Sequence, residues 1–343
     1  MTLAKSKYAQ EALQVVEELQ SYFAQNLNSV SKEFGENKPF EKVEWLRDGG
    51  KHGGGSRYEA RDEKVFNRGS VNVSQVHYDD DETKKLSSAT AISTIIHPQN
   101  PRVPSMHMHI SLTEMRDGKM YWRLMADLNP AIKDENDKQA FDAMLQTASG
   151  PFYEEGSAQG DRYFNIPVLN RTRGVSHFYL ENFNSGEFVV DRTFALSFGK
   201  KVIDQYISII SEALKNNPTI DEADKKEQLA YHTAYLFQVL TLDRGTTSGL
   251  LVHDQNDVGI MGSIPANIDA DLLKSWIELM PKPQEKLVNK LVEALGGSGV
   301  IHVDEAIKTK LANAVRTHYK EHPEAISMQA SGEIVPPTVQ NHQ

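Results

Sequence analysis

The stretch Ser-Thr-Ile-Ile-His-Pro-Gln-Asn-Pro-Arg-Val-Pro-Ser-Met-His-Met-His-Ile-Ser, residues 93–111, decides the fold expected for this chain. Strand-like sequence on either side of a proline-rich segment predicts two strands joined by a rigid loop. Pro98, Pro101 and Pro104 each lack a backbone N–H and fix φ, so the connection stays out of the strand ladder. His97 directly precedes this loop, and His107 and His109 follow it on the next expected strand. A loop that holds side chains in place without a helix suits a functional site.

Working outward, the Arg-Asp-Gly-Lys turn at 116–119 predicts a hairpin between the strand ending near Met115 and the next one. Strands are expected at 71–77, 91–97, 106–115, 120–127 and 177–180, and at 235–242 and 249–252, which a tight turn at 243–246 joins. Helices are expected at 5–27, 134–147, 200–214, 221–232, 268–280, 283–295 and 304–320. The strands cluster in blocks instead of alternating with helices, which favours an antiparallel α+β sheet over a parallel doubly wound one.

Two segments carry few apolar residues. The glycine-rich tract at 49–57 predicts a flexible or backbone-exposing loop. Residues 323–343, which include Pro336 and Pro337, predict a flexible C-terminal tail after a single domain spanning residues 1–322.

The composition excludes several classes of protein. The 343 residues carry a net charge of −10, whereas a nucleic-acid partner needs an extended basic face. The chain has no cysteine, which excludes disulfides and thiolate chemistry. No apolar run approaches the roughly 18 residues of a membrane span, and no signal peptide is evident. We therefore expect a cytoplasmic protein with no integral membrane segment and no nucleic-acid partner.

His107 and His109 alternate on one expected strand, so both imidazoles can reach the same metal ion. With Glu114 five residues further on, the pattern is similar to the first half of a cupin metal motif. The framing glycines and the second half of that motif are missing. A strand with one polar face explains the pattern more simply.

Three other features each have two interpretations. The tract His52-Gly53-Gly54-Gly55 is similar to the oxyanion loop of esterases, but the chain lacks a Gly-x-Ser-x-Gly elbow, and a mobile turn explains it as well. Asp127 ends an apolar strand, where a carboxylate needs a cation or N–H groups, unless it makes an Asx turn into Asn129. Several arginines stand on turns, where they suit bidentate carboxylate contacts or ordinary surface ion pairs. They are Arg171, Arg173, Arg192 and Arg244.

Taken in order, the motifs of this chain resemble those of the oxygen-dependent coproporphyrinogen III oxidases, and the chain is identified as a divergent member. The matching segments are Gly69-Ser-Val-Asn-Val-Ser-Gln-Val-His77, Ile96-His-Pro-Gln-Asn-Pro101, Val103-Pro-Ser-Met-His107, Asp127-Leu-Asn-Pro130, Arg173-Gly-Val175, Asp243-Arg-Gly-Thr-Thr-Ser-Gly-Leu250 and Ser263-Ile-Pro265. The resemblance implies a large, flat antiparallel sheet flanked by helices on both faces, assembled as a homodimer.

The resemblance also implies the reaction, in which dioxygen oxidatively decarboxylates two propionates of a porphyrinogen to vinyl groups in haem biosynthesis. No organic cofactor is required, and a divalent metal is a further option. The family's site residues fall on His107 and Asp127 as catalytic groups, on Ser93, His109, Ser111, Arg173 and Arg244 as substrate contacts, and on His97 and His107 as metal ligands. The remaining two metal positions fall on Asp142 and Val168, which departs from the family pattern. A paralogue that takes another tetrapyrrole, or a non-catalytic tetrapyrrole-binding protein, is the alternative function.

The chain departs from the family pattern mainly where the family has cations. Ser111 replaces an arginine, and residues 123–126 replace a glycine run before Asp127. Other arginine-bearing blocks are replaced at 168–174, 231–239 and 255–259. Each lost charge-assisted contact costs on the order of 1.5–3 kcal/mol. A tetra-anionic substrate is therefore expected to bind weakly unless other arginines compensate. The candidates are Arg57, Arg102, Arg123 and Arg171.

Overall fold

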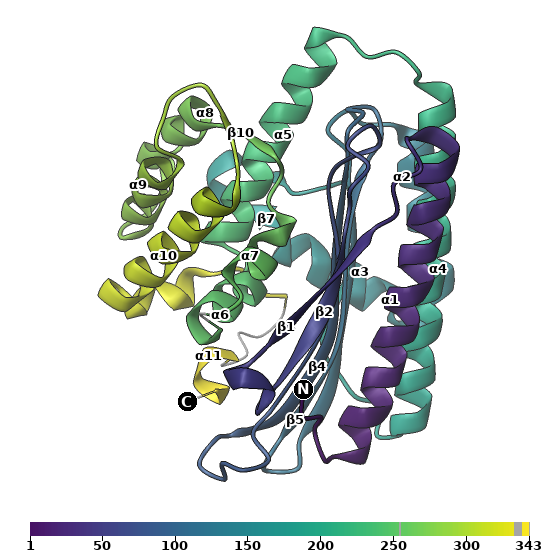
Figure 1. The fold of residues 1–343 in the computed structure, drawn as a ribbon, viewed down its shortest axis with the longest axis vertical. Helices are drawn as coiled ribbons and strands as arrows, with labels where there is room; N and C mark the ends of the chain where they lie inside the picture. Colours follow the sequence, from purple (N-terminus) through teal and green to yellow (C-terminus); the bar gives the residue numbers. More distant parts are fainter. Residues whose placement is uncertain (254, 333–337, 343) are drawn as a thin grey trace.

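A seven-stranded antiparallel sheet forms the centre of the computed structural model, which describes residues 1–253, 255–332 and 338–342 (Figure 1). Its strand order is β1-β2-β3-β4-β5-β6-β9, so neighbours in sequence are neighbours in the sheet until the last strand. The strands are β1 (Glu41–Leu46), β2 (Gly53–Glu59), β3 (Phe66–His77), β4 (Leu86–Pro98), β5 (Ser105–Met115), β6 (Met120–Asn129) and β9 (Ser176–Phe183). Two small pairs lie apart, β7 (Asn165–Ile166) with β8 (Arg171–Thr172) and β10 (Asn267–Asp269) with β11 (Val300–His302).

Helices cover both faces of this sheet (Figure 1). On one side lie α1 (Lys7–Phe34), α2 (Glu135–Ser149) and α4 (Phe188–Asn216), and α3 (Tyr153–Tyr163) packs along β9. The other side carries α5 (Glu222–Thr241), α6 (Arg244–Val252), α7 (Asp257–Ile260), α8 (Ala270–Ser275), α9 (Gln284–Leu295), α10 (Glu305–Glu321) and α11 (Thr338–Asn341). The expected α+β class, with a large antiparallel sheet flanked by helices on both faces, is confirmed.

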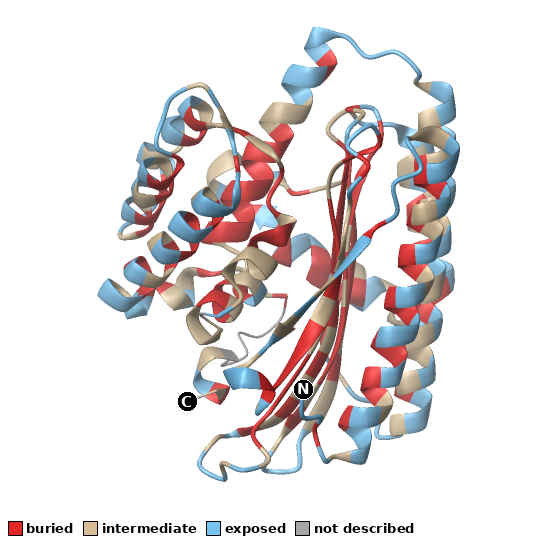
Figure 2. Cartoon of the chain, viewed as in Figure 1, coloured by how far each residue is buried: buried red, intermediate tan, exposed pale blue. Residues whose placement is uncertain are grey.

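The alternation of side chains along the strands separates the sheet into an apolar face and a polar face. On β5, Met106, Met108, Ile110 and Leu112 join the core cluster that packs against α1 and α4. The residues between them face the other helical layer. That layer has its own apolar cluster, formed largely by α5, α9 and α10. Both layers bury the sheet, and in Figure 2 the middle of the strands is coloured mostly as buried.

The hairpin and the proline loop predicted from the sequence are present. The β5–β6 turn is closed by a bond from Gly118 N to Met115 O of 3.1 Å, and Gly118 has φ +87°, a conformation that favours glycine. The proline-rich segment connects β4 to β5 without joining the ladder between them.

The expected strands at 235–242 and 249–252 are wrong, because the first lies mostly in the last turns of α5 and the second in α6. Every side chain from Tyr231 to Thr241 is buried, so this part of α5 has no polar stripe from which a helical period could be read. The expected turn at 243–246 is instead the start of α6, where the Asp243 side chain accepts a hydrogen bond from Thr246 N.

Several helix ends also differ from those expected. The first helix continues to Phe34 instead of residue 27, and α4 begins at Phe188 instead of residue 200. The single helix expected at 268–280 is divided into β10, α8 and a short 3-10 turn. Local sequence patterns thus predicted that these helices are present more reliably than they predicted where the helices begin and end.

The glycine-rich tract predicted to be a flexible loop is, from Gly53 onward, the buried strand β2. A Cβ placed on Gly55 would lie 2.0 Å from Val73 O and 3.0 Å from Ser74 Cα on the neighbouring strand β3. Glycine is needed here because the backbones of β2 and β3 approach closely, and not because the chain must be mobile.

We expect Gly55→Ala to lower the free energy of unfolding by about 1–3 kcal/mol, because the added methyl group must push β2 away from β3. Chemical denaturation of both proteins measures this difference. Gly262→Ala is the matched control, since a Cβ there meets only the Ser70 side chain, at 3.4 Å from Oγ and 3.7 Å from Cβ. Equal stability losses in the two variants would contradict a close-approach role for Gly55.

The C-terminal segment contacts the second helical layer where it is described. Gln329 Nε2 donates to Thr247 Oγ1 at 2.6 Å, and Ala330 N donates to Leu242 O at 3.0 Å. Residues 333–337 and 343, with the Pro336-Pro337 pair, lie outside the described residues. A flexible tail at 323–343 and a single domain at 1–322 therefore stay predictions.

In the described part of the chain, no helix has the length and apolar character needed to cross a membrane.

Candidate functional site

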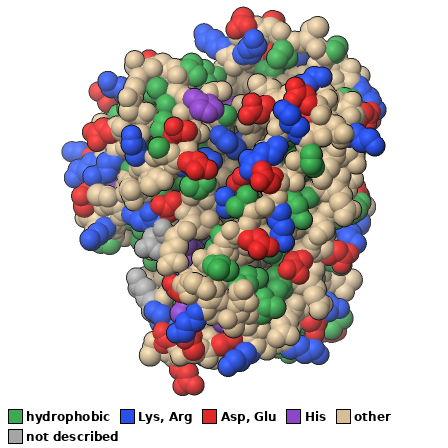
Figure 3. Space-filling view, viewed as in Figure 1, with side chains coloured by type: hydrophobic (Ala, Val, Ile, Leu, Met, Phe, Trp, Pro, Cys, Tyr) green, Lys and Arg blue, Asp and Glu red, His purple; other side chains and the backbone are tan. Residues whose placement is uncertain are grey.

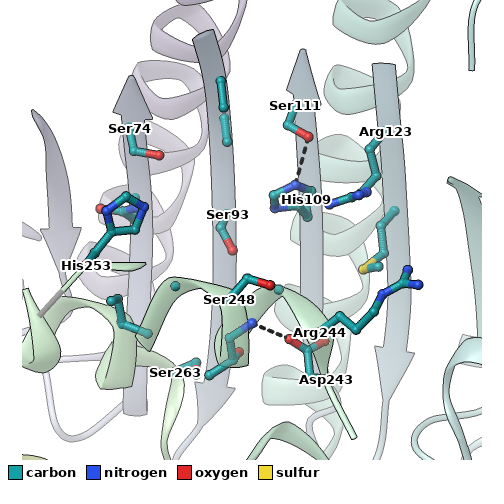
Figure 4. Close-up of a pocket in the computed structure, with 18 of the residues that line it drawn as sticks. Ser74, Ser93, His109, Ser111, Arg123, Asp243, Arg244, Ser248, His253 and Ser263 are labelled. Carbon is teal, nitrogen blue, oxygen red and sulfur yellow. Dashed lines mark hydrogen bonds between the residues drawn. The ribbon is translucent and has the colours of Figure 1, made fainter. Parts of the chain in front are cut away.

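A cavity of about 300 Å³ lies between the polar face of the sheet and the layer of C-terminal helices. Its floor comes from β3, β4, β5 and β6, and its opposite wall from α5, α6 and the segment that follows α6 (Figure 4). Small hydroxyl side chains line much of it, namely Ser70, Ser74, Ser93, Ser111, Thr113, Ser248 and Ser263. The pleat of the sheet decides this lining, because every second residue of each strand points into the cavity.

His107 and Asp127 form a hydrogen-bonded pair at one end of the cavity. They are direct partners across β5 and β6, and His107 Nδ1 lies 2.7 Å from Asp127 Oδ1. Asp127 is 0% exposed and lies behind His107, which lines the cavity. A carboxylate oxygen can only accept, so Nδ1 carries the proton and donates it to Asp127. The second ring nitrogen of His107, Nε2, has no hydrogen-bond partner among the described residues.

Asp127 is held ionised by its surroundings. Arg173 Nη2 lies 2.8 Å from Asp127 Oδ2, and Asn129 Nδ2 donates to the same oxygen at 2.6 Å. Burial by itself raises the pKa of the Asp127 carboxyl, but Arg173, His107 and Asn129 outweigh it and hold that pKa well below its usual value. Both carboxylate oxygens of Asp127 thus accept hydrogen bonds from other side chains of the protein. The Asx-turn interpretation is not needed, since the carboxylate is satisfied by three other side chains.

Arg173 is buried as the cationic partner of Asp127. Its guanidinium lies 4.4 Å from the centre of the Phe164 ring, and Nη1 donates to Gln238 Oε1 at 2.7 Å. Nη2 also lies 3.4 Å from His107 Nδ1, but two donors face each other there, so this contact is not a hydrogen bond. Arg173 lines the cavity with its charge already neutralised by Asp127.

Arg244 lines the opposite wall and is likewise paired. It forms a buried ion pair with Glu181 and approaches the Tyr179 hydroxyl at 3.4 Å. Asp243, next to it in the chain, accepts from Tyr163 OH at 2.9 Å as well as from Thr246 N. Both residues stand at the start of α6, and this position places them at the wall of the cavity.

The predicted contacts on β4 and β5 all line the cavity. Ser93 is the partner of His109 across these strands, and His109 Nε2 lies 3.0 Å from Ser111 Oγ (Figure 4). Burial, with Arg123 and His107 nearby, holds the pKa of His109 well below its usual value, so the ring is neutral at pH 7. Neutral His109 is a polar group without charge in the floor of the cavity.

His97, one of the two predicted metal positions, is fully buried and does not line the cavity. Its Nε2 donates to Ser263 O at 3.1 Å, so Nδ1 accepts from Ser105 Oγ at 2.9 Å. With one nitrogen of His107 also committed to Asp127, these two histidines are poorly suited to share a metal ion. No group of three or more metal-ligating side chains occurs within residues 1–253, 255–332 and 338–342.

Other predicted motifs lie away from the cavity. Glu114 points to the opposite face of the sheet, where it accepts from Ser6 Oγ and Ser88 Oγ, each at 2.6 Å. The cupin-like pattern therefore loses its carboxylate. His52 bonds Asp48 at 2.6 Å and Asp80 at 3.0 Å, which leaves the esterase-like interpretation without a site.

Of the four arginines named as possible compensating cations, Arg123 alone lines the cavity as far as the structure is described. Arg57 pairs with Glu59 at 2.5 Å, Arg102 pairs with Asp224 at 2.7 Å, and Arg171 is exposed. The sequence named Arg123 only as one of these four possible compensating cations, and not among the family's substrate contacts. Its position four residues before Asp127 on the same strand was the signal that places both on one face.

The outer surface differs from the cavity in its mixture of charges. On the face shown in Figure 3, basic and acidic side chains are interspersed. This face offers no continuous basic track to a nucleic-acid backbone.

Known proteins resemble the chain over most of its length. The family model described as Coproporphyrinogen III oxidase matches residues 11–294. A protein of Rickettsia akari (strain Hartford), named oxygen-dependent coproporphyrinogen-III oxidase, is 28% identical over 269 residues, which are 73% of this chain and 94% of the relative. The protein of the same name from Rickettsia bellii (strain RML369-C) is 29% identical over 243 residues, which are 67% of this chain and 84% of the relative. The chain, with its seven-stranded sheet and buried His107–Asp127 pair, belongs to the coproporphyrinogen III oxidase family.

Proposed function

We propose that this chain catalyses the oxygen-dependent oxidative decarboxylation of coproporphyrinogen III propionates to vinyl groups. The observation that carries the proposal is the His107–Asp127 pair at 2.7 Å in the wall of a cavity, in a chain that belongs to this family. Each cycle converts a propionate, dioxygen and one proton into a vinyl group, carbon dioxide and hydrogen peroxide. The two electrons leave with the hydrogen of the propionate carbon next to the ring and reduce dioxygen.

In this proposal His107 handles the proton that the reaction consumes. Asp127 fixes the tautomer, so that Nδ1–H points to the carboxylate and Nε2 is left to exchange a proton with the reactants. Asp127 also stabilises positive charge on the imidazole when Nε2 is protonated. Since Asp127 is fully buried and already bonded, we assign it the role of positioning His107.

A metal does not enter this proposal. His97 and His107 lie on two positions that the resemblance associates with divalent metal, but the ring of His97 has both nitrogens bonded inside the protein. Dioxygen is the oxidant, and no organic cofactor is invoked. A homodimer and a cytoplasmic location stay predictions of the sequence.

A second candidate is a paralogue of the same fold that takes a less acidic tetrapyrrole. The charges of the cavity favour it, because Arg173 and Arg244 are already neutralised by Asp127 and Glu181. Coproporphyrinogen III brings four carboxylates. A ligand with fewer carboxylates would meet a better-matched site.

The aerobic conversion of coproporphyrinogen III by the purified protein tests the proposal. Product is followed as protoporphyrin fluorescence after oxidation, against spontaneous oxidation in a blank without protein. We expect turnover of coproporphyrinogen III with release of one carbon dioxide per vinyl group. A folded protein that converts none of it, yet binds another tetrapyrrole, would overturn the proposal in favour of the paralogue.

A further inference from the structure

Arg123 differs from the other two arginines of the cavity because no described residue pairs with it directly. Within the described ranges, which omit residues 254, 333–337 and 343, no hydrogen bond or ion pair to its guanidinium is found, and its Nε is buried without a partner. Guanidinium groups stay charged in proteins. A buried, unpaired donor is costly, and such groups are usually explained by a missing partner.

The other two arginines of the cavity are each paired with a carboxylate. Arg173 is bound to Asp127 and Arg244 to Glu181. Two histidines of the lining, His253 and His342, add no charge at neutral pH. Burial, with Arg47 nearby, lowers the pKa of His253 to about 3 and that of His342 to about 4, so both are neutral at pH 7. Among the described residues that line the cavity, Arg123 is therefore the arginine that no carboxylate pairs directly, and it can be offered to an anionic ligand.

The surroundings of Arg123 suit a carboxylate. Ser111 is its direct partner across β5 and β6, and in Figure 4 the Arg123 side chain extends towards His109. Cross-strand partners have Cβ atoms about 5 Å apart, which is within reach of one bound group. Glu181 attracts Arg123 at longer range, but that carboxylate is engaged by Arg244. A bidentate carboxylate at Arg123 would satisfy the buried Nε.

The position of Arg123 separates it from the reaction centre. Arg123 and Asp127 are four residues apart on β6, and a strand rises about 3.3 Å per residue, so the two positions are roughly 13 Å apart. A carboxylate held at Arg123 is thus offset along β6 from the His107–Asp127 pair. An elongated or flat ligand can be anchored at one end and react at the other.

We propose that Arg123 anchors the tetrapyrrole by one carboxylate, in a cavity that holds no second unpaired cation among its described residues. The ligand class is accordingly a tetrapyrrole recognised through a single carboxylate, with its other substituents in contact with hydroxyl and apolar side chains. This inference rests on the proposed function for the tetrapyrrole nature of the ligand.

Fluorescence titration with three porphyrins tests the anchor. The probes are protoporphyrin IX, which has two carboxylates, its dimethyl ester, which has none, and coproporphyrin III, which has four, all in one detergent-containing buffer. We expect protoporphyrin IX to bind about 10- to 100-fold more tightly than the ester. This factor is the usual contribution of one charge-assisted hydrogen bond to affinity. Coproporphyrin III should bind no more tightly than protoporphyrin IX.

Arg123→Met should bring the affinity for protoporphyrin IX down to that of the ester and leave the ester unaffected. Arg123→Lys should retain part of the difference, and a thermal melt of each variant reports whether it is folded. Arg171→Met is the matched control, because it removes the same charge from an exposed site outside the cavity and should change nothing.

Two results would overturn the anchor. One is a preference for acid over ester that survives in folded Arg123→Met, and the other is coproporphyrin III binding more than tenfold more tightly than protoporphyrin IX. Carboxylate-dependent binding without turnover of coproporphyrinogen III would contradict the proposed function alone. Turnover that is unchanged in Arg123→Met would contradict the anchor alone. Absence of porphyrin binding to the folded wild-type protein would overturn both.

Discussion

Replacing His107 by glutamine is expected to lower the rate of propionate decarboxylation by about 10²- to 10⁴-fold, the usual contribution of a positioned proton-transfer group. Glutamine retains a polar side chain in the cavity wall but cannot exchange a proton at neutral pH. The binding of protoporphyrin IX should change little, because the proposed anchor is Arg123, which lies four residues along β6 from Asp127, the partner of His107. Steady-state turnover and fluorescence titration of the same preparation measure the two effects separately.

His52→Gln is the matched control for this variant. His52 is bonded to Asp48 and Asp80 and does not line the cavity, so its replacement should leave turnover within about twofold of the wild-type rate. If His107→Gln retains the wild-type rate, His107 has no part in proton transfer. If binding and turnover fall together, its role is to hold the ligand.

Asp127→Ala is expected to lower the free energy of unfolding by about 3–5 kcal/mol, since it leaves the buried Arg173 without its carboxylate. Turnover should also fall, because His107 loses the group that fixes its tautomer. Urea denaturation gives the first quantity and the coproporphyrinogen assay the second. Unchanged turnover in a folded Asp127→Ala protein would contradict the positioning role of this carboxylate.

A double variant separates the charge effect from the loss of packing. In Asp127→Ala with Arg173→Met both charges are removed, so the double variant should be more stable than Asp127→Ala by a clear margin. Asp127→Asn keeps the size of the side chain and should destabilise less than alanine. The free energy of unfolding of the Arg173→Met single variant completes the comparison. If the loss in the double variant equals the sum of the losses in the two single variants, the ion pair contributes nothing specific to stability.

The effect of Asp127 also depends on pH, in a direction set by its lowered pKa. An unfolded Asp has a pKa near 3.9, and in the folded chain Arg173, His107 and Asn129 outweigh burial and hold this pKa lower. Its contribution to stability is therefore complete above about pH 5 and is lost as the pH falls through the folded pKa. The stability gap between wild type and Asp127→Asn should accordingly narrow on acidification.

The sequence by itself determined strands β3 to β6 and β9 of the sheet and most of its polar face. Period-two alternation set which side chains of β5 and β6 share a side, and the Asp-Gly turn joined those strands in register. Ser93, His109 and Ser111 therefore line the same cavity. These features were readable because a strand places successive side chains on opposite faces whatever the rest of the fold does.

The tertiary structure alone decided the second wall of the cavity and the charge of the site. α5 is buried on all sides near its end, which removed the periodicity that would have identified it as a helix. The pairing of Arg173 with Asp127 and of Arg244 with Glu181 joins residues 46 and 63 positions apart in the chain. No local pattern reports such partners. Which arginine is left for a ligand depends on the folded packing, because packing decides which of the arginines have a carboxylate within bonding distance.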